Sequence, residues 1–455
     1  MSEPTPAPDP AGPELVGPDP RVPGTPEEVG RRTHPLSALV QGLLYSAAAT
    51  IALVGSTLTG GGWGDLHALI SFGVAIVAGL VLGMIAGYVS WRFTRYVIDH
   101  TEVRVTTGFL SRASRRIPFE RIQSVDVAEP LVARVFGLAE LRIDSAGGSD
   151  SSTSIKYLEK SEVQRLRRVL LARAHGDVLD DDVEQPAEQR SLITRVPPER
   201  VVYGTLLSLD FVFAVVAFVA LVVMAIWFDQ VLVALGGAVS FGSVIVQMIG
   251  KRVLQQWNFT LSRGEHGLRI ERGLLSRTSQ TIPFDRVQGI AIKEPFVWRR
   301  LGWQRLEVDV AGYSSRSDDV DEGQVTTLLP ITDPALAGAI IEELLPIGGP
   351  TVESHHMARG ARLFAPIGWR YRSVTASPGV VIATTGWIQR TTSRVPHRKS
   401  QSVELRQGPL QRWRGVATVE IHTPPGPVDA DGDHLADAEA RSLWVAQVER
   451  TRTAG

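Results

Sequence analysis

The sequence predicts a membrane protein of mixed α and β class, with two transmembrane helical hairpins and three small antiparallel β-barrels that each end in a closing helix. Two observations predict this class. Four stretches are apolar and long enough to cross a bilayer as helices, and the segments between and after them repeat one motif three times. The order of these features along the chain places each predicted element.

The composition bounds the class of protein. The chain has 455 residues, which is the length of about three domains. Its 47 Lys and Arg residues balance 48 Asp and Glu residues, whereas a dedicated nucleic-acid binder shows a strong basic excess. There is no cysteine, so disulfides, thiolate metal sites and cysteine nucleophiles are excluded. We therefore expect no nucleic-acid partner.

The first predicted element is a tail. Residues 1–30 hold nine prolines among scattered acids, a composition that cannot form a core, so we expect disorder there. The first apolar stretch begins after this tail, which is too late for a cleaved signal peptide.

Four apolar stretches follow as two pairs, over residues 36–58, 66–89, 201–228 and 231–250. About 20 apolar residues suffice to cross a hydrocarbon core of about 30 Å. Short turns join the members of each pair, which predicts transmembrane hairpins over 36–89 and 201–250. The alternative, buried helices of a soluble protein, would show a charged face, but Asp210 is the single charged residue in these stretches.

The charges beside the spans predict the topology. Arg or Lys flanks the same end of every span, and Asp65 and Asp229 are the charged residues of the two turns. By the positive-inside rule both turns lie outside, while both termini and all soluble domains of this multi-pass cell-membrane protein lie in the cytoplasm. The flanking cations are candidate contacts for lipid headgroups: Arg92, Arg95, Lys251 and Arg252.

Small residues recur at four-residue spacing in the second span. Gly79, Gly83 and Gly87 form two overlapping Gly-x-x-x-Gly steps. Such steps let helix backbones approach closely in lipid, so we predict that these glycines pack the helices together.

Asp210 has two interpretations. An ionisable side chain inside a span is costly and marks a functional site by default, here a transport role. Asp210 also lies near one end of a long segment, where Thr205 and Ser208 could satisfy its carboxylate locally. The sequence shows no second buried acid or base in the other spans to complete a proton relay.

The soluble segments contain a threefold repeat of glycine, proline and glutamine. The proline follows the glycine by ten residues, the glutamine follows the proline by five, and a further glycine stands fourteen residues later. The repeated residues are Gly108, Pro118 and Gln123, then Gly273, Pro283 and Gln288, then Gly386, Pro396 and Gln401. We expect the proline and glutamine to define a turn rather than a binding site.

The repeat spacing predicts where the hairpins lie. The interval from Pro118 to Pro283 is longer than the interval from Pro283 to Pro396. The difference is close to the length of one hairpin with its turn. We therefore expect a hairpin before each of the first two barrels and none before the third.

Each copy shows strands followed by one helix. Apolar and polar residues alternate around Leu141, Leu306 and Val419, as in half-buried strands. A capping box at Ser161 and an N-cap at Asp333 start the first two closing helices, and 435–448 is the third. The predicted barrels span 91–175, 256–346 and 369–450, with an acidic linker over 176–200 and a second linker over 347–368.

The Gly-x-x-x-Arg, Ile/Val-Pro and Gln core behind apolar hairpins resembles the bacterial pleckstrin-homology-like (PH-like) domain membrane proteins of the YdbS/YdbT type. The resemblance covers about residues 36–450. It implies seven-stranded PH-like barrels, each capped by a C-terminal helix, and no enzymatic activity. The third copy departs from the other two, because His397 replaces Phe119 and Phe284.

Sequence patterns for catalysis, cofactors and metals are missing. There is no phosphate loop, dinucleotide fingerprint or zinc helix. Ser240 lies inside a span rather than at a strand–turn–helix elbow. Asp429, Asp431 and Asp433 resemble a calcium loop, but His434 takes the place of the required glycine. We predict a non-enzymatic protein with no cofactor and no metal.

The leading functional hypothesis is a scaffold, adaptor or envelope-stress protein whose cytoplasmic barrels bind a protein partner or the lipids of the inner leaflet. We expect the first two barrels to contact anionic headgroups, the second through a basic surface with Arg277 and Arg286, and the third to meet a soluble partner. The alternative is a transport or resistance protein that handles a lipid or a membrane-active peptide. The sequence leaves the partner and the oligomeric state open.

Overall fold

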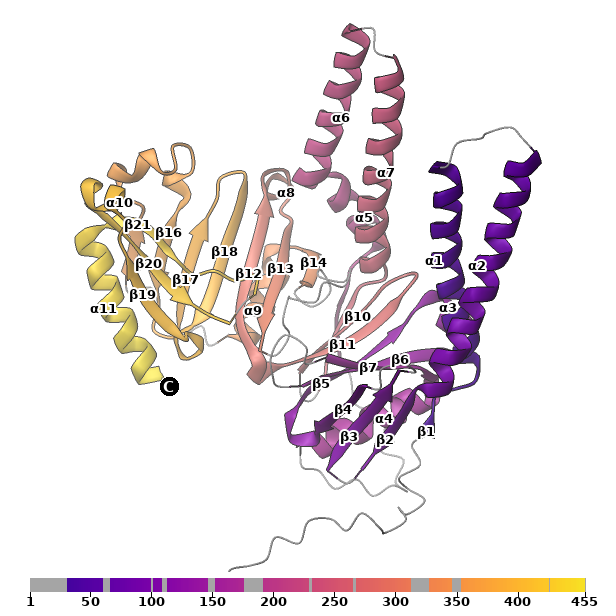
Figure 1. The fold of residues 1–455 in the computed structure, drawn as a ribbon. Coiled ribbons are helices and arrows are strands. Elements are labelled where there is room, and N and C mark those ends of the chain that lie inside the picture. Colours follow the sequence, from indigo (N-terminus) through magenta and orange to yellow (C-terminus); the bar gives the residue numbers. More distant parts are fainter. Residues whose placement is uncertain are drawn as a thin grey trace, which may run out of the picture.

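The computed structural model describes residues 31–59, 66–99, 101–108, 113–145, 152–175, 191–228, 231–264, 267–311, 327–345, 353–424 and 426–454. These residues form three consecutive units of one design (Figure 1). In the described residues each unit has seven strands, split into half-sheets of four and three, and a closing helix. The predicted tail and the two turns with Asp65 and Asp229 lie outside the described residues.

The strands and the closing helix follow the same order in every unit, and the elements between the first two strands differ. Unit 1 comprises β1 (Arg31–Arg32), α1 (Leu36–Thr59), α2 (Leu66–Phe93), β2 (Arg95–Ile98), β3 (Glu102–Thr107), β4 (Ala113–Pro118), β5 (Ile122–Glu129), α3 (Leu131–Val135), β6 (Leu138–Ser145), β7 (Ser152–Glu159) and α4 (Lys160–His175). Unit 2 comprises β8 (Ser191–Arg195), α5 (Pro198–Leu206), α6 (Leu209–Trp227), α7 (Val231–Gln256), β9 (Thr260–Arg263), β10 (Gly267–Arg272), β11 (Arg277–Pro283), β12 (Val287–Pro295), α8 (Phe296–Arg300), β13 (Gln304–Val310), β14 (Thr327–Thr332) and α9 (Pro334–Leu344). Unit 3 comprises β15 (Glu353–His356), two 3₁₀ turns (Arg359–Leu363 and Trp369–Tyr371), β16 (Ser373–Ala376), β17 (Val380–Thr385), β18 (Gln389–Pro396), β19 (Ser402–Arg406), α10 (Pro409–Arg414), β20 (Val416–His422), β21 (Gly432–Ala436) and α11 (Asp437–Ala454).

Each hairpin is inserted between the first and second strands of its unit. β1 pairs with β2 and β8 pairs with β9, so both ends of a hairpin start from adjacent strands. In unit 3 the two 3₁₀ turns take this place between β15 and β16. The expectation that the hairpins precede the barrels is therefore corrected. Units 2 and 3 begin at Ser191 and Glu353, inside the stretches 176–200 and 347–368 that we expected to be linkers.

The sheets run across the unit boundaries. The three-stranded half-sheet of unit 1 continues from β5 into β11 of unit 2, in the order β7-β6-β5-β11-β10-β9-β8. A second sheet joins units 2 and 3 through β12 and β18, in the order β14-β13-β12-β18-β17-β16-β15. We call these two strand pairs joint 1 and joint 2. The predicted closed barrels are corrected here: no sheet of the described residues closes on itself, and β5, β11, β12 and β18 pair with the neighbouring unit instead of closing their own.

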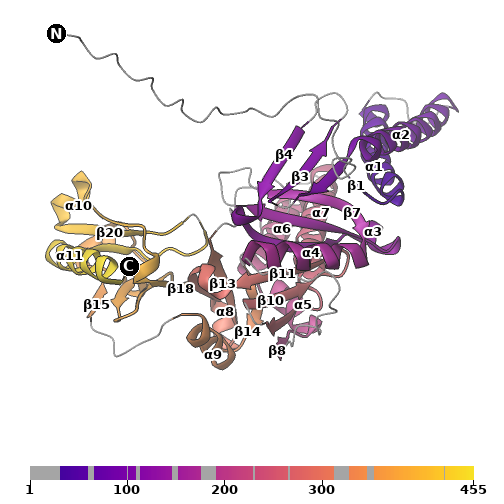
Figure 2. The ribbon, with the colours of Figure 1, turned by 90° about the horizontal axis from the view of Figure 1, so that it is seen from below.

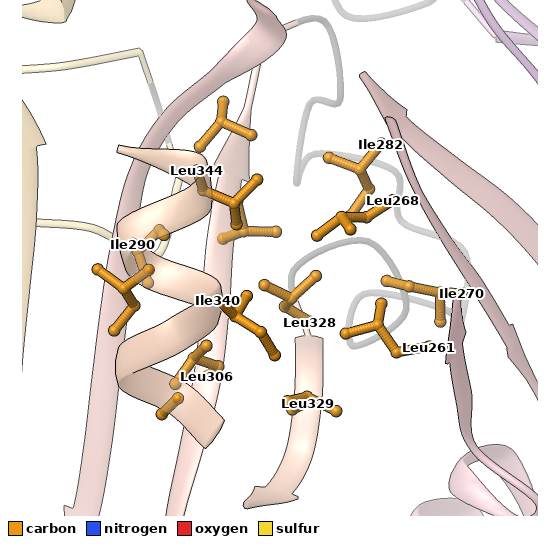
Figure 3. Packing of buried hydrophobic residues seen from close by; sticks show 14 of the residues in the cluster. Leu261, Leu268, Ile270, Ile282, Ile290, Leu306, Leu328, Leu329, Ile340 and Leu344 are labelled. Carbon is orange, nitrogen blue, oxygen red and sulfur yellow. The ribbon is translucent and has the colours of Figure 1, made fainter. Parts of the chain in front are cut away.

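Each unit still has a hydrophobic core between its two half-sheets and its closing helix. In unit 2, Leu261 and Leu268 of the four-stranded half face Ile290 and Leu306 of the three-stranded half, and Ile340 of α9 covers the gap (Figure 3). All five side chains are at most 2% exposed. Truncation of such a side chain to alanine costs about 2–5 kcal/mol. A unit is thus held by its core, while the sheets hold one unit to the next.

The closing helices start close to their sequence signals. The Asp333 carboxylate accepts a hydrogen bond from the Leu336 amide at 2.9 Å, as an N-cap does. The third helix, α11, begins at Asp437, because Leu435 is a buried residue of β21.

The glycines of the second span lie at the contact between α1 and α2. A Cβ atom on Gly83 would lie 2.2 Å from the backbone nitrogen of Ser46, so no larger residue fits. A Cβ atom on Gly79 would likewise be too close to Thr50, and one on Gly87 too close to Gly42. The Ser46 hydroxyl donates to the Leu80 carbonyl oxygen at 3.0 Å across this contact.

The third predicted span is interrupted. A turn at Ser208, whose hydroxyl accepts a hydrogen bond from the Phe211 amide, separates α5 from α6. α5 packs on its own unit, where a Cβ atom on Gly204 would lie 2.1 Å from Ile331. In the described residues two helices are long and apolar enough to cross a membrane, Gly73–Phe93 and Leu209–Trp227, and Leu36–Ala52 is a shorter apolar helix.

Candidate membrane-contact site

The repeated glycine builds a tight turn, here called the tip, between the third and fourth strands of units 2 and 3. Gly273 and Gly386 have φ angles of +107° and +89°. A Cβ atom on Gly386 would lie 2.0 Å from the Gln389 carbonyl oxygen, so the turn requires glycine. The tips of units 2 and 3 project apolar side chains that are 36 to 45% exposed: Leu274, Leu275, Trp387 and Ile388.

A short helix follows the fifth strand of each unit, namely α3, α8 and α10. A glycine with a φ angle between +65° and +71° follows each short helix. These are the glycines that stand fourteen residues after the repeated glutamine: Gly137, Gly302 and Gly415. The short helices also carry exposed apolar side chains: Leu131, Val135, Phe296, Leu410 and Trp413. Trp413 is 72% exposed, so a large apolar ring faces outward.

At joint 2 the tip of unit 3 meets the short helix of unit 2. The ring centres of Phe296 and Trp387 are 6.4 Å apart. Arg299 donates a hydrogen bond to the Trp387 carbonyl oxygen at 2.7 Å. The guanidinium groups of Arg299 and Arg300 lie 5.7 and 5.2 Å from the centre of the Phe296 ring. Aromatic rings beside cations suit the interface between lipid and water.

The tips and short helices lie on the side of the units from which the hairpins rise. Figure 1 shows α8 and α10 at the ends of their strands nearest the α6–α7 hairpin, and α3 beside the lower part of α1. In unit 2 the Leu274 amide donates to the Leu254 carbonyl oxygen of α7 at 2.8 Å. We call the exposed apolar residues of the tips and short helices the rim: Leu131, Val135, Leu274, Leu275, Phe296, Trp387, Ile388, Leu410 and Trp413.

Asp210 has a partner that the sequence did not reveal. Its carboxylate accepts a hydrogen bond from Arg252 at 2.5 Å, and Arg252 also donates to the Ser208 hydroxyl. Asp210 stands in the first turn of α6, at the end of the span. Arg305 of β13 lies near the charges of Asp210 and Arg252. Burial lowers the pKa of Arg305, although the charge of Glu307 opposes this shift. Arg252 is therefore part of an ion-pair network at the base of the hairpin.

The other predicted headgroup contacts are spread out. Arg92 and Lys251 are exposed near the hairpin ends, while Arg95 is half-buried in β2. Arg277 binds Glu271 at 2.9 Å beside joint 1. The seven-residue strand β11 separates Arg277 from Arg286, a distance of about 20 Å. Arg277 and Arg286 thus stand at opposite ends of β11, and their contact with lipid headgroups stays a prediction.

The proline and glutamine of the repeat shape the corner between the two half-sheets. In each unit the proline precedes one 3₁₀ turn. Gln123 and Gln288 fall where the register between the fifth and sixth strands shifts, as at a β-bulge. These repeat residues turn the chain from one sheet into the other.

Unit 3 has a polar corner where units 1 and 2 have phenylalanine. His397 is 1% exposed, and its Nε2 atom lies 2.8 Å from the Ser377 carbonyl oxygen. Its Nδ1 atom lies 2.9 Å from the side-chain amide of Gln447. Burial lowers the pKa of His397, because the charged imidazolium would lose its hydration. The sequence singled out His397 but not Gln447, which lies on the closing helix α11.

One group of side chains in the described residues could hold a metal ion, although the sequence predicts none. Glu404, Glu420 and His422 place their ligand atoms within 4.8 Å of one another on β19 and β20. His422 lies 3.5 Å from Glu404, so an exposed ion pair accounts for the group. In the calcium-like stretch, Asp431 accepts a hydrogen bond from the Ile421 amide at 3.0 Å.

Comparison with known proteins matches the three units. A family model described as bacterial PH domain matches residues 47–174, 205–346 and 351–453. The UPF0699 transmembrane protein YdbT of Bacillus subtilis is 23% identical over 292 residues, which cover 58% of this chain and 59% of that relative. The alignment thus spans less than two thirds of the relative's length. The first strands β1 and β8 lie outside the matched stretches.

Proposed function

The chain belongs to the bacterial PH domain family, and from this membership and the rim we propose that it is a non-enzymatic, multi-pass protein of the cell membrane. Its transmembrane relative and its apolar helices support a place in the membrane. Its three PH-like units act as a scaffold that is held on the inner leaflet through the rim. The observation that carries this proposal is the recurrence of exposed apolar tips and short helices on the hairpin side.

All four helices of the two hairpins cross the bilayer in this proposal. α1 and α7 expose apolar side chains along their length, among them Ile51, Val239 and Val246 at 69 to 75%. Both hairpins rise on the same side of the row of units (Figure 1). Arg and Lys at the unit ends of the helices favour a cytoplasmic location for the units and both termini.

The rim supplies lipid contact in addition to the hairpins. Burying a large apolar side chain contributes about 1.5–3 kcal/mol, and each cation beside an anionic leaflet about 1 kcal/mol. Arg414 lies 5.0 Å from the Trp413 ring, so both contributions meet at one place in α10. Unit 3 therefore uses lipid contact in place of the hairpin it lacks. This extends the lipid contact that we expected for the first two units to the third, whose opposite face remains free for a soluble partner.

The alternative of transport or resistance has less support from the described residues. Asp210, the one carboxylate of the four apolar stretches, lies at a helix end in an ion pair with Arg252. A proton relay needs further titratable groups along the span.

Site-specific labelling tests the proposal, because the chain contains no cysteine. Trp413→Cys, labelled with an environment-sensitive fluorophore in the full chain, is placed in nanodiscs of neutral or anionic lipid. We expect blue-shifted emission and quenching by brominated lipid, stronger with anionic lipid at low salt.

Glu449→Cys is the matched control, because Glu449 is exposed in the C-terminal part of α11 of the same unit, and this end of the helix points away from α10 (Figure 1). Its label should show water-like emission in every disc. Equal emission from both positions would contradict lipid contact by the rim.

A further inference from the structure

Two of the outer strands in the described part of the chain are counterparts of joint strands but have no partner in a neighbouring unit. β4 of unit 1 has β3 as its strand neighbour, and β19 of unit 3 has β20. Their counterparts in the other units are the joint strands: β11 and β18 correspond to β4, and β5 and β12 correspond to β19. The described row of three units therefore carries one half of a joint at each outer edge.

The two joints use one register. In joint 1 Arg277 lies opposite Glu129, and in joint 2 Arg390 lies opposite Glu294. In both cases the arginine is four residues after the repeated glycine, and the glutamate is six residues after the repeated glutamine. The same pairing has thus formed twice in one chain, which makes it a property of the unit and not of one boundary.

We propose that β19 of one copy pairs with β4 of a second copy in this register, so that copies join head to tail into a continuous row of units. In the joint register Ala113 lies opposite Arg406, and Ser114 lies opposite Leu405. These pairs correspond to Thr278 with Ala128 and to Ser279 with Val127 in joint 1.

The open edges point in the direction that such a joint needs. Thr281 of β11, the counterpart of Arg116, directs its backbone N–H across joint 1 to Asp126 at 3.4 Å. Residues two apart in a strand face the same way, so the amide of Ser114 faces the open edge of β4. Ser114 is exposed, whereas its counterpart Ser279, which β5 covers, is 9% exposed.

The helix side chain at the β19 edge also matches joint 1. The Trp444 indole donates to the Val403 carbonyl oxygen at 3.1 Å. The counterpart in unit 1, Arg167, donates to the Val125 carbonyl oxygen at 3.0 Å, and joint 1 forms beside it. The hydrogen bond of Trp444 therefore occupies Val403 only, and the open edge of β19 from Leu405 onward stays available for pairing with another strand.

The chemistry of the two edges favours a second copy as the occupant. β4 carries the exposed Arg116 beside Arg115, which donates to Thr153 of its own unit, and β19 carries Glu404, with a side chain that is 60% exposed. Polar and charged residues can protect an edge from pairing. β18 contains Arg390 and Arg394 and still forms joint 2, so this composition does not prevent pairing.

The membrane permits this assembly. The step from unit 1 to unit 2 keeps both hairpins on one side of the row (Figures 1 and 2). Repeating the same joint from unit 3 to the next copy leaves all hairpins on that side, in one bilayer. Because the contact joins two different surfaces, it generates a ring or an open row rather than a closed dimer.

Cysteine crosslinking of the full chain in native membranes tests the proposal. Ala113→Cys with Arg406→Cys places two exposed positions opposite each other, about 4.5–5.5 Å apart between Cα atoms, within reach of a disulfide. β4 and β19 lie in the first and last units, so a crosslink joins two chains. We expect mild oxidation to give a ladder of dimers, trimers and larger species, and each single-cysteine variant, which has no thiol opposite it in the joint, to give no ladder.

Two controls keep the result specific. Ala113→Cys with Glu404→Cys shifts the register by two residues and should crosslink roughly tenfold less, because the Cα atoms then exceed the reach of a disulfide. Ser114→Pro, added to the first pair, removes the amide at the open edge and should abolish the ladder without changing thermal unfolding. Absence of the ladder, an equal ladder from the shifted pair, or a ladder that survives Ser114→Pro would each overturn the proposal.

Discussion

Joint 1 and joint 2 pair equivalent strands in one register, yet they differ in length: three residue pairs in joint 1 and six in joint 2. One position of the closing helix explains the difference. Arg167 of α4 occupies the Val125 carbonyl oxygen and ends joint 1 there. Its counterpart in α9, Ile341, is an apolar core residue that leaves the strand free. The pairing of β12 with β18 therefore extends as far as Ile290, the counterpart of Val125. A helix side chain thus decides how far two units pair.

The largest expected effect comes from removing that side chain. Arg167 also donates to the Thr281 hydroxyl at 2.7 Å, so Arg167→Ala leaves groups on both sides of joint 1 without this partner. We expect the free energy of unfolding to fall by about 2–4 kcal/mol. Denaturant unfolding of the full chain in nanodiscs measures it. The exposed neighbour gives the control Arg168→Ala, and an equal loss from both variants would refute the clamp.

A smaller effect is expected at the tip that leads into joint 2. Gly386→Ala brings Cβ to 2.0 Å from a carbonyl oxygen at a φ of +89°, so the turn must shift. We expect a loss of about 2 kcal/mol in the free energy of unfolding. Gly302→Ala is the matched control, because its Cβ meets nothing within 4 Å and only its φ of +67° is unfavourable. The control should lose about 1 kcal/mol. A loss from Gly386→Ala that is no larger would show that the short distance between Cβ and the Gln389 carbonyl oxygen is unimportant.

The smallest effect distinguishes the joints by pH. Burial lowers the pKa of His397 at the end of β18, whereas joint 1 has Phe284 at this place. Below a pH of about 6.5 the imidazole of His397 binds a proton in the unfolded chain but stays neutral in the folded unit. The free energy of unfolding of unit 3 therefore decreases as the pH falls. His397→Phe with Gln447→Leu, the residue types of unit 2, should flatten the free energy of unfolding between about pH 7 and pH 5.

Two further side chains of unit 3 affect the pH dependence of its free energy of unfolding. The charge of Arg450 adds to the lowering of the His397 pKa. Burial also lowers the pKa of His434, whose ring stacks on Phe364 at 4.6 Å between centres. A residual slope from His434 is therefore expected in the double variant. An unchanged slope would mean that His397 does not set the pH dependence.

Local signals predicted much of the fold. The repeated glycines, the N-cap at Asp333 and the alternation around Leu306 all act within a few residues, so they can be read directly from the sequence. The resemblance to PH-like membrane proteins rested on the same repeat and is confirmed by the match to the bacterial PH domain family.

The features that sequence reasoning missed depend on partners far along the chain. β15 is a four-residue strand with two histidines, and its strand character comes from pairing with β16 rather than from an apolar pattern. Asp210 pairs with Arg252 of the next helix, and Gln447 pairs with a histidine that precedes it by several strands. The joints unite edges of different units, and nothing in the local pattern of β5 distinguishes an edge that closes a barrel from one that continues a sheet.

The insertion of a hairpin between the first two strands also sets an order for biosynthesis. In unit 2, β8 ends at Arg195 and β9 begins at Thr260, and both apolar helices lie between these two strands. The ribosome therefore releases β8 long before its partner strand exists, and in the proposed topology the pair forms only after the hairpin has entered the bilayer. In that topology, completion of units 1 and 2 waits for the insertion machinery. Unit 3, whose first two strands are separated by a short segment with two 3₁₀ turns, is ready to fold as soon as it leaves the ribosome.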